Sequence, residues 1–294
     1  MRAGTTTLYY QLLNHPEVVM AGVKEPNFFA FDGEQTDLPL TDEALERMRA
    51  NSVVDVGSYH QLFLRRRGAQ AVGDVSPAYL YSSVAARQIR QVVPDIRLIA
   101  ILRDPVDRAY SAYFRRADVD PDPGVFVETA EREHEKMERG DKLPLYPLIK
   151  GGLYSQHLPS YLDLFSSDRR MICIFETFWN DHLSSLEEIH RFIGVSPIPA
   201  TDVPSLNRSG VPRWPFVDQA LRSGTRVKEL TKRYLPNRAV SALVATKQAI
   251  EDWTLRESSE LPEAARSYLM DTYFETDIER VEDMLNRDLS IWRR

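Results

Sequence analysis

The segment RLIAILRDPVDRAYSAYFRR, residues 97–116, contains the residue types needed to bind a phosphate. Its apolar first part is typical of a buried strand. The Asp-Pro pair that begins at Asp104 is a good helix start, with the aspartate as N-cap and the proline at the first helical position. Arg103 then lies at the carboxyl end of the strand, and Ser111 lies two turns into the helix. A guanidinium and a hydroxyl beside a helix start can bind a phosphate, which points to a nucleotide.

The N-terminal residues form a second phosphate-type element. A basic residue, a glycine and three threonines precede an apolar helical pattern; they are Arg2, Ala3, Gly4, Thr5, Thr6 and Thr7. Glycine lets the backbone approach an anion, and hydroxyls at a helix N-terminus add donors at the positive end of its dipole. Each element alone also has a purely structural interpretation. In the first segment, Asp104 and Arg108 could form a surface ion pair, and in the N-terminal segment Thr5 could be an N-cap. Two such elements in one chain favour a nucleotide site.

A carboxylate that could act as a base follows the predicted strand near residue 20. The motif is KEPNFF, residues 24–29, in which Glu25 lies beside a lysine and two aromatic residues. Such surroundings can tune a carboxyl group between acid and base, and a general base typically contributes ~10²- to 10⁴-fold in rate. The alternative is a surface ion pair between Lys24 and Glu25.

In their order along the chain, these segments resemble the sulfotransferases that use 3′-phosphoadenosine-5′-phosphosulfate (PAPS). The resemblance rests on RAGTTTLYYQLLNHP, VKEPNFF, VGDVSPAYLY and LRDPVDRAYSAYFRR, and it continues through GLYSQHLPSYLDLF, ICIFETFWND, FIGV and DIERVEDMLNRDLSIW. It is greatest for the branch that contains heparan-sulfate-type and bacterial carbohydrate or polyketide sulfotransferases. It implies an enzyme that moves a sulfuryl group from PAPS to an acceptor hydroxyl and releases 3′,5′-ADP (PAP). The implied acceptor is a small molecule, carbohydrate or lipid, and a carbohydrate, a glycolipid and a polyketide-like alcohol all remain open.

The resemblance also implies how the donor is bound. Arg2 would contact the 5′-phosphosulfate and stabilise the charge that develops on the leaving PAP, while Ala3, Gly4 and the three threonines Thr5, Thr6 and Thr7 would hold the 5′-phosphate. Arg103 and Ser111 would grip the 3′-phosphate, and Arg213 would add a contact to it from a late loop. No metal is implied, because arginine and lysine can balance the charge.

On the acceptor side, the resemblance implies that Glu25 is the catalytic base. Four further residues are implied to bind the acceptor: Lys24, Asn27, Asp74 and Ser76. Asn27 departs from the family pattern, because many relatives have a histidine there, so an amide leaves only a hydrogen-bonding role. Val75 also departs, since the heparan-sulfate branch has a lysine at this position. The loss of that charge argues against heparan sulfate itself as the acceptor.

Composition and charge set the class of protein. The chain has 294 residues, 43% hydrophobic and 27% charged, which is enough for a single α/β domain over residues 1–294. No apolar run approaches the ~20 residues of a membrane-spanning helix, so we expect a soluble protein. The only cysteine, Cys173, excludes an internal disulfide, which fits a cytoplasmic location. The net charge of −6 argues against a nucleic-acid partner.

Short apolar runs alternate with helical patterns, which favours an α/β fold with a parallel β-sheet flanked by helices on both faces. The resemblance implies that this sheet is P-loop-like. The predicted strands are Val18–Gly22, Ala71–Asp74, Leu98–Leu102 and Met171–Phe175. The predicted helices are Thr5–Asn14, Asp42–Arg49, Tyr79–Val92, Pro105–Asp118, Val125–Arg139, Leu153–Phe165, Leu183–Ile193 and Pro262–Leu285. We expect a helical C-terminal part over about 216–294, and acceptor-cleft loops at 118–124 and 197–215.

In P-loop architectures the phosphate loop follows a central strand, whereas here it begins at residue 2. The sequence therefore predicts a sheet that lacks its first strand, and we expect Met1 to correspond to an internal methionine of a longer natural chain. Two alternatives remain open. One is a catalytically silent, truncated nucleotide-binding protein, and the other is a P-loop ATP-dependent kinase, although the full GxxxxGK[ST] loop is absent.

Overall fold

The computed structural model describes residues 3–33, 35–64, 68–116, 123–199, 210–212, 255–257 and 260–293. Two of the predicted site residues, Arg2 and Arg213, lie outside the described residues, as does most of the two predicted cleft loops.

Four short parallel strands lead into the predicted site segments. They form two pairs, β1 (Val18–Met20) with β2 (Ala71–Gly73), and β3 (Leu98–Leu102) with β4 (Arg170–Ile174). Each overlaps a predicted strand. In the described part of the chain no ladder joins the two pairs, so the expected sheet is divided between β1–β2 and β3–β4. This division is compatible with the predicted lack of a strand before the phosphate loop, which stays a prediction.

Helices make up most of the remaining described structure. The α-helices are α1 (Thr5–Leu13), α2 (Asp42–Arg49), α3 (Val56–Gln61), α4 (Ser83–Val92), α5 (Pro105–Tyr113), α6 (Pro123–Glu138), α7 (Tyr154–His157), α8 (Pro159–Leu164), α9 (Phe175–Asn180), α10 (His182–Ile193), α14 (Glu263–Leu269) and α15 (Glu275–Leu285). Shorter turns of helix are η1 (Phe28–Ala30), η2 (Pro77–Tyr81), η3 (Lys150–Gly152), η4 (Ser167–Arg169) and η6 (Ser290–Arg293), with a π-helical turn η5 (Met270–Phe274). An antiparallel pair that the sequence did not predict joins β5 (Gly210–Pro212) to β6 (Leu255–Glu257).

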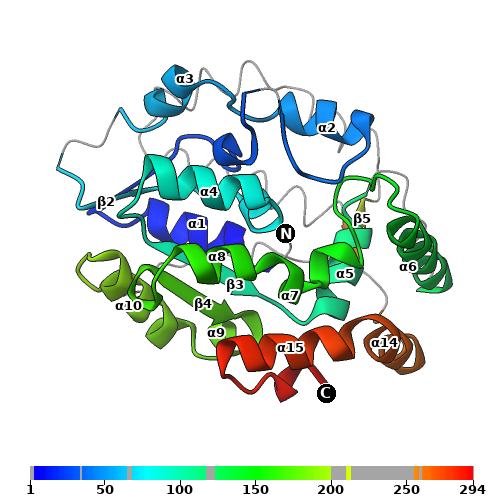
Figure 1. The fold of residues 1–294 in the computed structure, drawn as a ribbon. Coiled ribbons are helices and arrows are strands. Elements are labelled where there is room, and N and C mark those ends of the chain that lie inside the picture. The colour runs from blue at the N-terminus through cyan, green and yellow to red at the C-terminus, as the bar shows by residue number, and fades with distance from the viewer. Residues whose placement is uncertain are drawn as a thin grey trace.

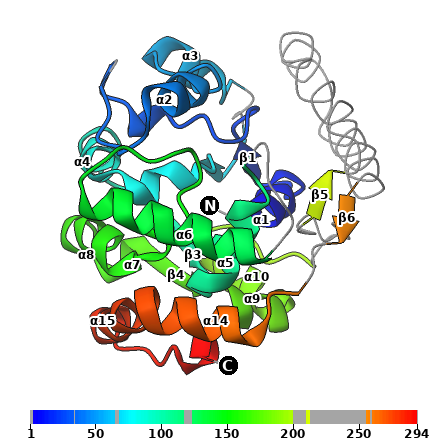
Figure 2. The ribbon, with the colours of Figure 1, turned by 90° about the vertical axis from the view of Figure 1, so that its right-hand side faces the viewer.

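The β3–β4 pair is covered on both faces by helices. Successive side chains along a strand point to opposite faces, and here they enter two different apolar clusters. Ile99 and Ile101 join the cluster formed around α1 and α10, whereas Leu102 joins the cluster around α5 and α15. The residues from Met171 to Ile174 alternate between the same two clusters. The predicted helices on both faces are thus confirmed, and Figures 1 and 2 show β3 and β4 surrounded by helices.

Several predicted helices are divided in the structure, each for a local reason. Ser82 is extended and its hydroxyl accepts a hydrogen bond from the Ala85 N–H at 3.0 Å, so η2 ends before it and α4 begins after it. Pro159 opens α8 and separates it from α7. The predicted helix over 262–285 contains the π-helical turn η5, where Phe274 is fully buried against Gly152. Helices α3 and α9 were not predicted.

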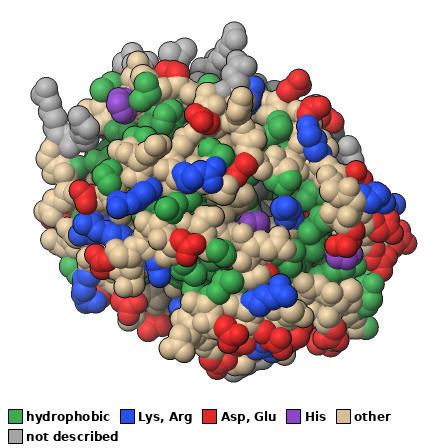
Figure 3. Space-filling view, viewed as in Figure 1, with side chains coloured by type: hydrophobic (Ala, Val, Ile, Leu, Met, Phe, Trp, Pro, Cys, Tyr) green, Lys and Arg blue, Asp and Glu red, His purple; other side chains and the backbone are tan. Residues whose placement is uncertain are grey.

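The face of the molecule in Figure 3 carries mixed charge. Acidic side chains gather along its right and lower edges, over α6, α14 and α15, while lysine and arginine side chains are spread across its middle. This distribution agrees with the net charge of −6. None of the helices in the described ranges is long and apolar enough to cross a membrane.

Two buried histidines are expected to make the fold sensitive to acid. His157 exposes 8% of its surface, and its Nε2–H donates a hydrogen bond to the Lys150 carbonyl at 2.8 Å. Burial lowers the pKa of His157 to about 4. His190 exposes 1% and packs its ring 4.6 Å from that of His15; burial, and then His15, lower its pKa to about 4. An unfolded chain would bind protons at both sites near pH 6.5.

We therefore predict that the free energy of unfolding falls as the pH is lowered from about 6.5 to about 4, because only the unfolded state readily takes up these protons. Urea unfolding at a series of pH values would measure this dependence. Replacing His190 with glutamine should flatten it, whereas His60→Gln, on the exposed end of α3, should not. An equal slope in the wild type and His190→Gln would contradict the prediction.

Candidate active site

The predicted site residues follow the carboxyl ends of the parallel strands. In the pair β1–β2, the chain continues from β1 to Glu25 and from β2 to Asp74 and Ser76. In the pair β3–β4, it continues from β3 to Arg103 and from β4 into α9, which begins at Phe175. Ligands bind at the carboxyl edge of open α/β sheets because loops and helix starts converge there.

The loop that carries Glu25 is held in a strained conformation. Glu25 and Asn27 both have left-handed backbones, with φ of 62° and 50°, which costs about 1–3 kcal/mol for each residue. The Glu25 N–H donates to the Val75 carbonyl at 2.9 Å, and the Asn27 N–H donates to the Ser76 hydroxyl at 3.1 Å. The Asn27 side-chain amide donates to the Ser52 hydroxyl at 3.1 Å. These bonds hold the backbone of the loop against the end of β2, and so place the Glu25 side chain there.

Asn27 and Ser76, predicted to bind the acceptor, are therefore also parts of the loop's support. They expose only 7% and 8% of their surfaces. Asp74 is similarly engaged, since its Oδ2 accepts hydrogen bonds from the Tyr59 and Tyr79 hydroxyls at 2.7 and 3.1 Å. Burial raises the pKa of Asp74 although these hydroxyls partly offset the effect. The acceptor contacts of these residues stay predictions.

The Glu25 carboxylate is ionised and remains accessible. Burial raises its pKa, but the Lys24 ammonium, which is hydrogen-bonded to it, and Arg115 more than offset this, so the pKa lies below its usual range. The Lys24 and Glu25 side chains are 23% and 36% exposed. The predicted Lys24–Glu25 ion pair is present, and it leaves Glu25 in the form that can take up a proton at neutral pH.

Removal of the Lys24 charge is expected to move the pH dependence of any reaction that uses Glu25 as a base. In Lys24→Met the largest of the influences that lower the Glu25 pKa is lost, and the smaller one of Arg115 remains. The Glu25 pKa therefore rises, and the acidic limb of a kcat/KM profile shifts to higher pH. Lys142→Met is the matched control, because Lys142 pairs with Asp42 on the surface. An unmoved acidic limb in Lys24→Met would mean that Glu25 does not control it.

The predicted phosphate loop begins α1 in an unexpected way. Gly4, not Thr5, is the N-cap, and it has a left-handed backbone with φ of 77°. A Cβ at this position would lie 2.7 Å from Nε1 of Trp179 and 2.9 Å from a ring carbon of Phe175, so no side chain fits. Among its predicted partners, Ala3 and Thr7 are buried, and Thr5 and Thr6 are half-buried. The glycine is thus required both by its backbone and by close packing.

Arg103 lies where the sequence predicts, at the end of β3. The Tyr154 hydroxyl holds its backbone, accepting from the Arg103 N–H at 3.2 Å and donating to its carbonyl at 2.8 Å. The guanidinium lies over the ring of Phe175, with Cζ 4.9 Å from the ring centroid, and Nη2 is 3.7 Å from Oδ2 of Asp107. The side chain is 19% exposed. The Phe175 ring and the Asp107 carboxylate therefore hold the Arg103 guanidinium in one orientation, which favours binding of an anion from one side.

The rest of the predicted strand-to-helix element is also present. Asp104 caps α5 by accepting from the N–H groups of Val106 and Asp107 at 2.8 and 2.9 Å. Ser111 lies on the same helix and exposes 3% of its surface. The alternative of a surface ion pair between Asp104 and Arg108 is wrong, because Arg108 exposes only 2% and its guanidinium donates to the carbonyls of Pro147 and Leu148.

The C-terminal helices take part in this element through two contacts that the sequence did not reveal. Arg266 of α14 donates to Asp104 Oδ2 at 2.7 Å and to Asp107. Glu176 of α9 accepts from the Asp104 N–H at 2.9 Å and from the indole N–H of Trp292 at 2.8 Å. The start of α5 is thereby tied to both α9 and the C-terminal segment. Phe175 and Glu176 lie in ICIFETFWND, one of the segments on which the resemblance rests, but the sequence did not predict their contacts.

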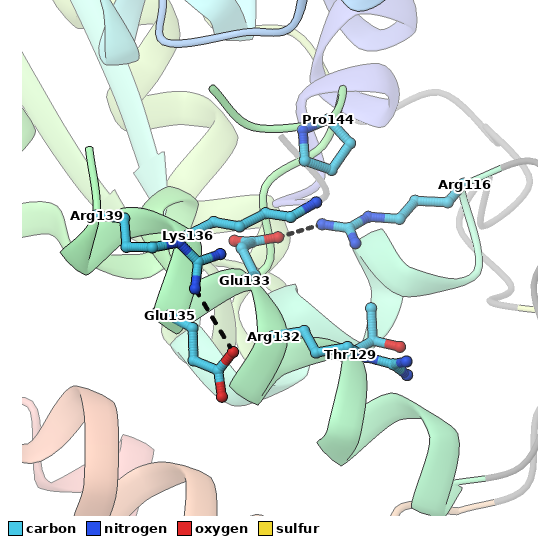
Figure 4. A pocket seen from close by; sticks show the side chains of 8 residues that line it. All are labelled: Arg116, Thr129, Arg132, Glu133, Glu135, Lys136, Arg139 and Pro144. Atoms are coloured by element: carbon cyan, nitrogen blue, oxygen red, sulfur yellow. Dashed lines mark hydrogen bonds and ion pairs between the residues drawn. The ribbon is translucent and has the colours of Figure 1, made fainter. Parts of the chain in front are cut away.

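A cavity of about 360 Å³ lies at the end of α5, beside α6, and Figure 4 shows its lining. Its lining residues are Arg116, Thr129, Arg132, Glu133, Glu135, Lys136, Arg139 and Pro144. Each arginine is matched by a carboxylate: Arg116 by Glu133, Arg139 by Glu135 and Asp141, and Arg132 by Glu128. The lining itself contains four basic side chains and two acidic ones, so it carries a net positive charge. The sequence predicted none of these residues as part of a site.

Comparison with known proteins decides the family. A family model described as "Sulfotransferase family" matches residues 1–198. The chain belongs to the sulfotransferase family. This confirms the resemblance seen in the sequence.

Curated sulfotransferases are similar to this chain over about two thirds to three quarters of its length. Human heparan sulfate glucosamine 3-O-sulfotransferase 6 is 26% identical over 197 residues, which are 67% of this chain and 51% of that protein. Carbohydrate sulfotransferase 15 of Rattus norvegicus is 22% identical over 277 residues, 75% of this chain and 49% of that protein. The chain thus spans about half the length of these relatives.

A solved sulfotransferase structure is similar over the whole chain. The sulfotransferase from Alicyclobacillus acidocaldarius is 25% identical and has a TM-score of 0.69, with 100% of this chain and 95% of that chain covered. This similarity supports an α/β sulfotransferase fold.

In the described ranges of this sulfotransferase-family chain, no cluster of three or more histidine, cysteine, aspartate or glutamate side chains could hold a metal ion.

Proposed function

We propose that this chain is a sulfotransferase that takes a sulfuryl group from PAPS and transfers it to an acceptor hydroxyl. One observation carries the proposal: Phe175 contacts both Gly4 of the phosphate loop and the Arg103 guanidinium. The two elements that the sequence assigns to opposite ends of the donor nucleotide therefore meet on one side chain. The family match does not favour the alternative of an ATP-dependent kinase.

In the proposed reaction, Glu25 Oε takes the proton of the acceptor hydroxyl as its oxygen attacks the sulfur of PAPS. The new S–O bond forms as the bond between sulfur and the phosphate oxygen of PAPS breaks, and PAP leaves with that electron pair. The protonated Glu25 then returns its proton to solvent. The low pKa of Glu25 favours the carboxylate before the reaction, and Lys24 supplies positive charge beside it.

We propose Arg103 and Ser111 as the ligands of the 3′-phosphate, and the Gly4 loop with its threonines as the P-loop-like cradle of the 5′-phosphate. Arg103 supports this assignment by its position at a strand end beside the Asp104-capped start of α5. Arg2 and Arg213 belong to the same proposal and lie outside the described residues. No metal enters the proposed reaction, since the arginine and lysine side chains supply the positive charge.

For the acceptor, we propose a hydroxyl of a carbohydrate or of a carbohydrate-bearing lipid. The names of the curated relatives, which include heparan sulfate and carbohydrate sulfotransferases, support this class. At the end of β2, Val75 gives this chain an apolar side chain between Asp74 and Ser76. A weakly charged or neutral sugar suits such a site better than a polyanionic one.

Isothermal titration with PAP and with ATP, each with and without Mg²⁺, tests the donor assignment. We expect micromolar PAP binding without Mg²⁺, and weak or no ATP binding. Binding of ATP that requires Mg²⁺ would instead support a kinase. If neither nucleotide binds, the proposed donor site is wrong for this chain.

A further inference from the structure

Helix α9 presents two aromatic side chains to the proposed donor site. Phe175 and Trp179 are one turn apart and so lie on the same face of the helix. Their rings contact each other edge to face, with centroids 6.1 Å apart and an angle of 63°. Neither residue is among the site residues predicted from the sequence.

The two rings contact different parts of the donor site. Phe175 lies under the Arg103 guanidinium at 4.9 Å and also against Gly4. Trp179 also lies against Gly4, since its Nε1 would be 2.7 Å from a Cβ at that position. The same indole nitrogen is buried without a hydrogen-bond partner in the described part of the chain. Trp179 is therefore placed to support the phosphate loop, and Phe175 to orient Arg103.

The helix that carries these rings is itself fixed. Glu176, between them, accepts hydrogen bonds from the Asp104 backbone and from Trp292. Phe178, one turn after Phe175, exposes only 4%, lies in the cluster of α1 and α10, and packs its ring edge to face against that of Trp179 at 4.9 Å. A rigid helix with rings against both phosphate elements can set their relative position.

We propose that Phe175 and Trp179 are positioning residues that set the spacing and direction of the two phosphate-binding elements for PAP. Phe175 holds the Arg103 guanidinium in the direction that meets the 3′-phosphate, through a cation–π contact. Trp179 holds the Gly4 turn in the position that meets the 5′-phosphate. This inference rests on the proposed function, because it takes Arg103 and Gly4 as the two ends of the nucleotide site.

The two roles can be separated by comparing PAP with 5′-AMP, which lacks the 3′-phosphate. The measured quantity is the ratio of the AMP Kd to the PAP Kd, obtained by isothermal titration of the full chain. In Phe175→Leu we expect this ratio to fall about 3- to 10-fold, as for the loss of one partly buried cation–π contact. Phe175→Tyr keeps the ring and should restore the ratio. In Trp179→Leu both Kd values should rise by a similar factor, with the ratio unchanged.

A merely structural role would not change the ratio. Phe31→Leu is the matched control, because Phe31 is 3% exposed, lies under Arg49 with Cζ 5.7 Å from the ring centroid, and packs in a cluster around α2 that contains neither phosphate element. It should lower the unfolding temperature without moving the ratio. If Phe175→Leu does not fold, Phe175→Met fills a similar volume without a ring and is expected to lower the ratio equally.

Two outcomes would overturn the inference while leaving the proposed function intact. In the first, the ratio of the AMP Kd to the PAP Kd in Phe175→Leu or Phe175→Met stays within 2-fold of the wild-type ratio. In the second, Trp179→Leu lowers this ratio as much as the Phe175 variants do. A wild-type chain that binds PAP no better than AMP would instead overturn the proposed 3′-phosphate site, and the inference with it.

Discussion

Replacing Glu25 with glutamine is expected to lower kcat for sulfuryl transfer by ~10²- to 10⁴-fold while leaving PAP affinity unchanged. Glutamine matches the size of glutamate and keeps the backbone N–H that donates to Val75, so the strained loop can be retained. An amide, however, cannot take the proton of the acceptor hydroxyl. The loss should therefore be confined to the chemical step.

Single-turnover transfer from PAPS to a carbohydrate acceptor, together with PAP titration, measures the two quantities separately. Glu46→Gln is a suitable control, because Glu46 is an exposed residue of α2 and should retain full activity. If Glu25→Gln transfers sulfuryl groups at the wild-type rate, the base is another residue. If it fails to bind PAP, the loop serves the donor and not the acceptor.

Replacing Arg103 with alanine is expected to weaken PAP binding by ~2–4 kcal/mol, which is ~30- to 1,000-fold in Kd. The guanidinium is mostly enclosed, at 19% exposure, and the variant removes the charge that would meet the 3′-phosphate. Affinity for AMP, which has no such phosphate, should change far less. The backbone of residue 103 should stay in place, since Tyr154 binds its N–H and carbonyl, not its side chain.

Titration of both nucleotides against Arg103→Ala measures this difference. Arg97→Ala provides the control, because Arg97 precedes the opposite end of β3 and is exposed. An equal loss of PAP and AMP affinity in Arg103→Ala would point to a general disturbance of the site. Unchanged PAP affinity would refute the 3′-phosphate assignment.

The strands were predictable because short apolar runs are typical of parallel strands, although β2 itself is only partly covered, with Val72 exposed. Each is a short run of apolar residues, and the run from Leu98 to Leu102 has no polar position at all. The start of α5 was predictable for a similar reason, since Asp104 and the following proline form a complete local signal. Glu25 and Arg103 could be placed because they follow such strands directly.

Helix α9 could not be predicted in the same way because it has no local start signal. It follows β4 without an intervening loop, and no side chain caps it. Its position depends instead on Glu176, whose partners are far away in the sequence. The burial of Arg108 was missed because an isolated arginine on a helix is usually solvated, and only the fold supplies the carbonyls of Pro147 and Leu148.

The contacts of Arg266 and Trp292 matter for exchanging segments between relatives. The family match ends at residue 198, so residues 1–198 look like a transferable unit. Asp104, however, exposes only 5% and its carboxylate pairs with Arg266, while Glu176 accepts from Trp292. A chimera that took residues 1–198 alone would leave one enclosed carboxylate without its cation and the other without its indole donor. Segment 260–293 therefore has to be inherited together with the first, as a single unit of recombination.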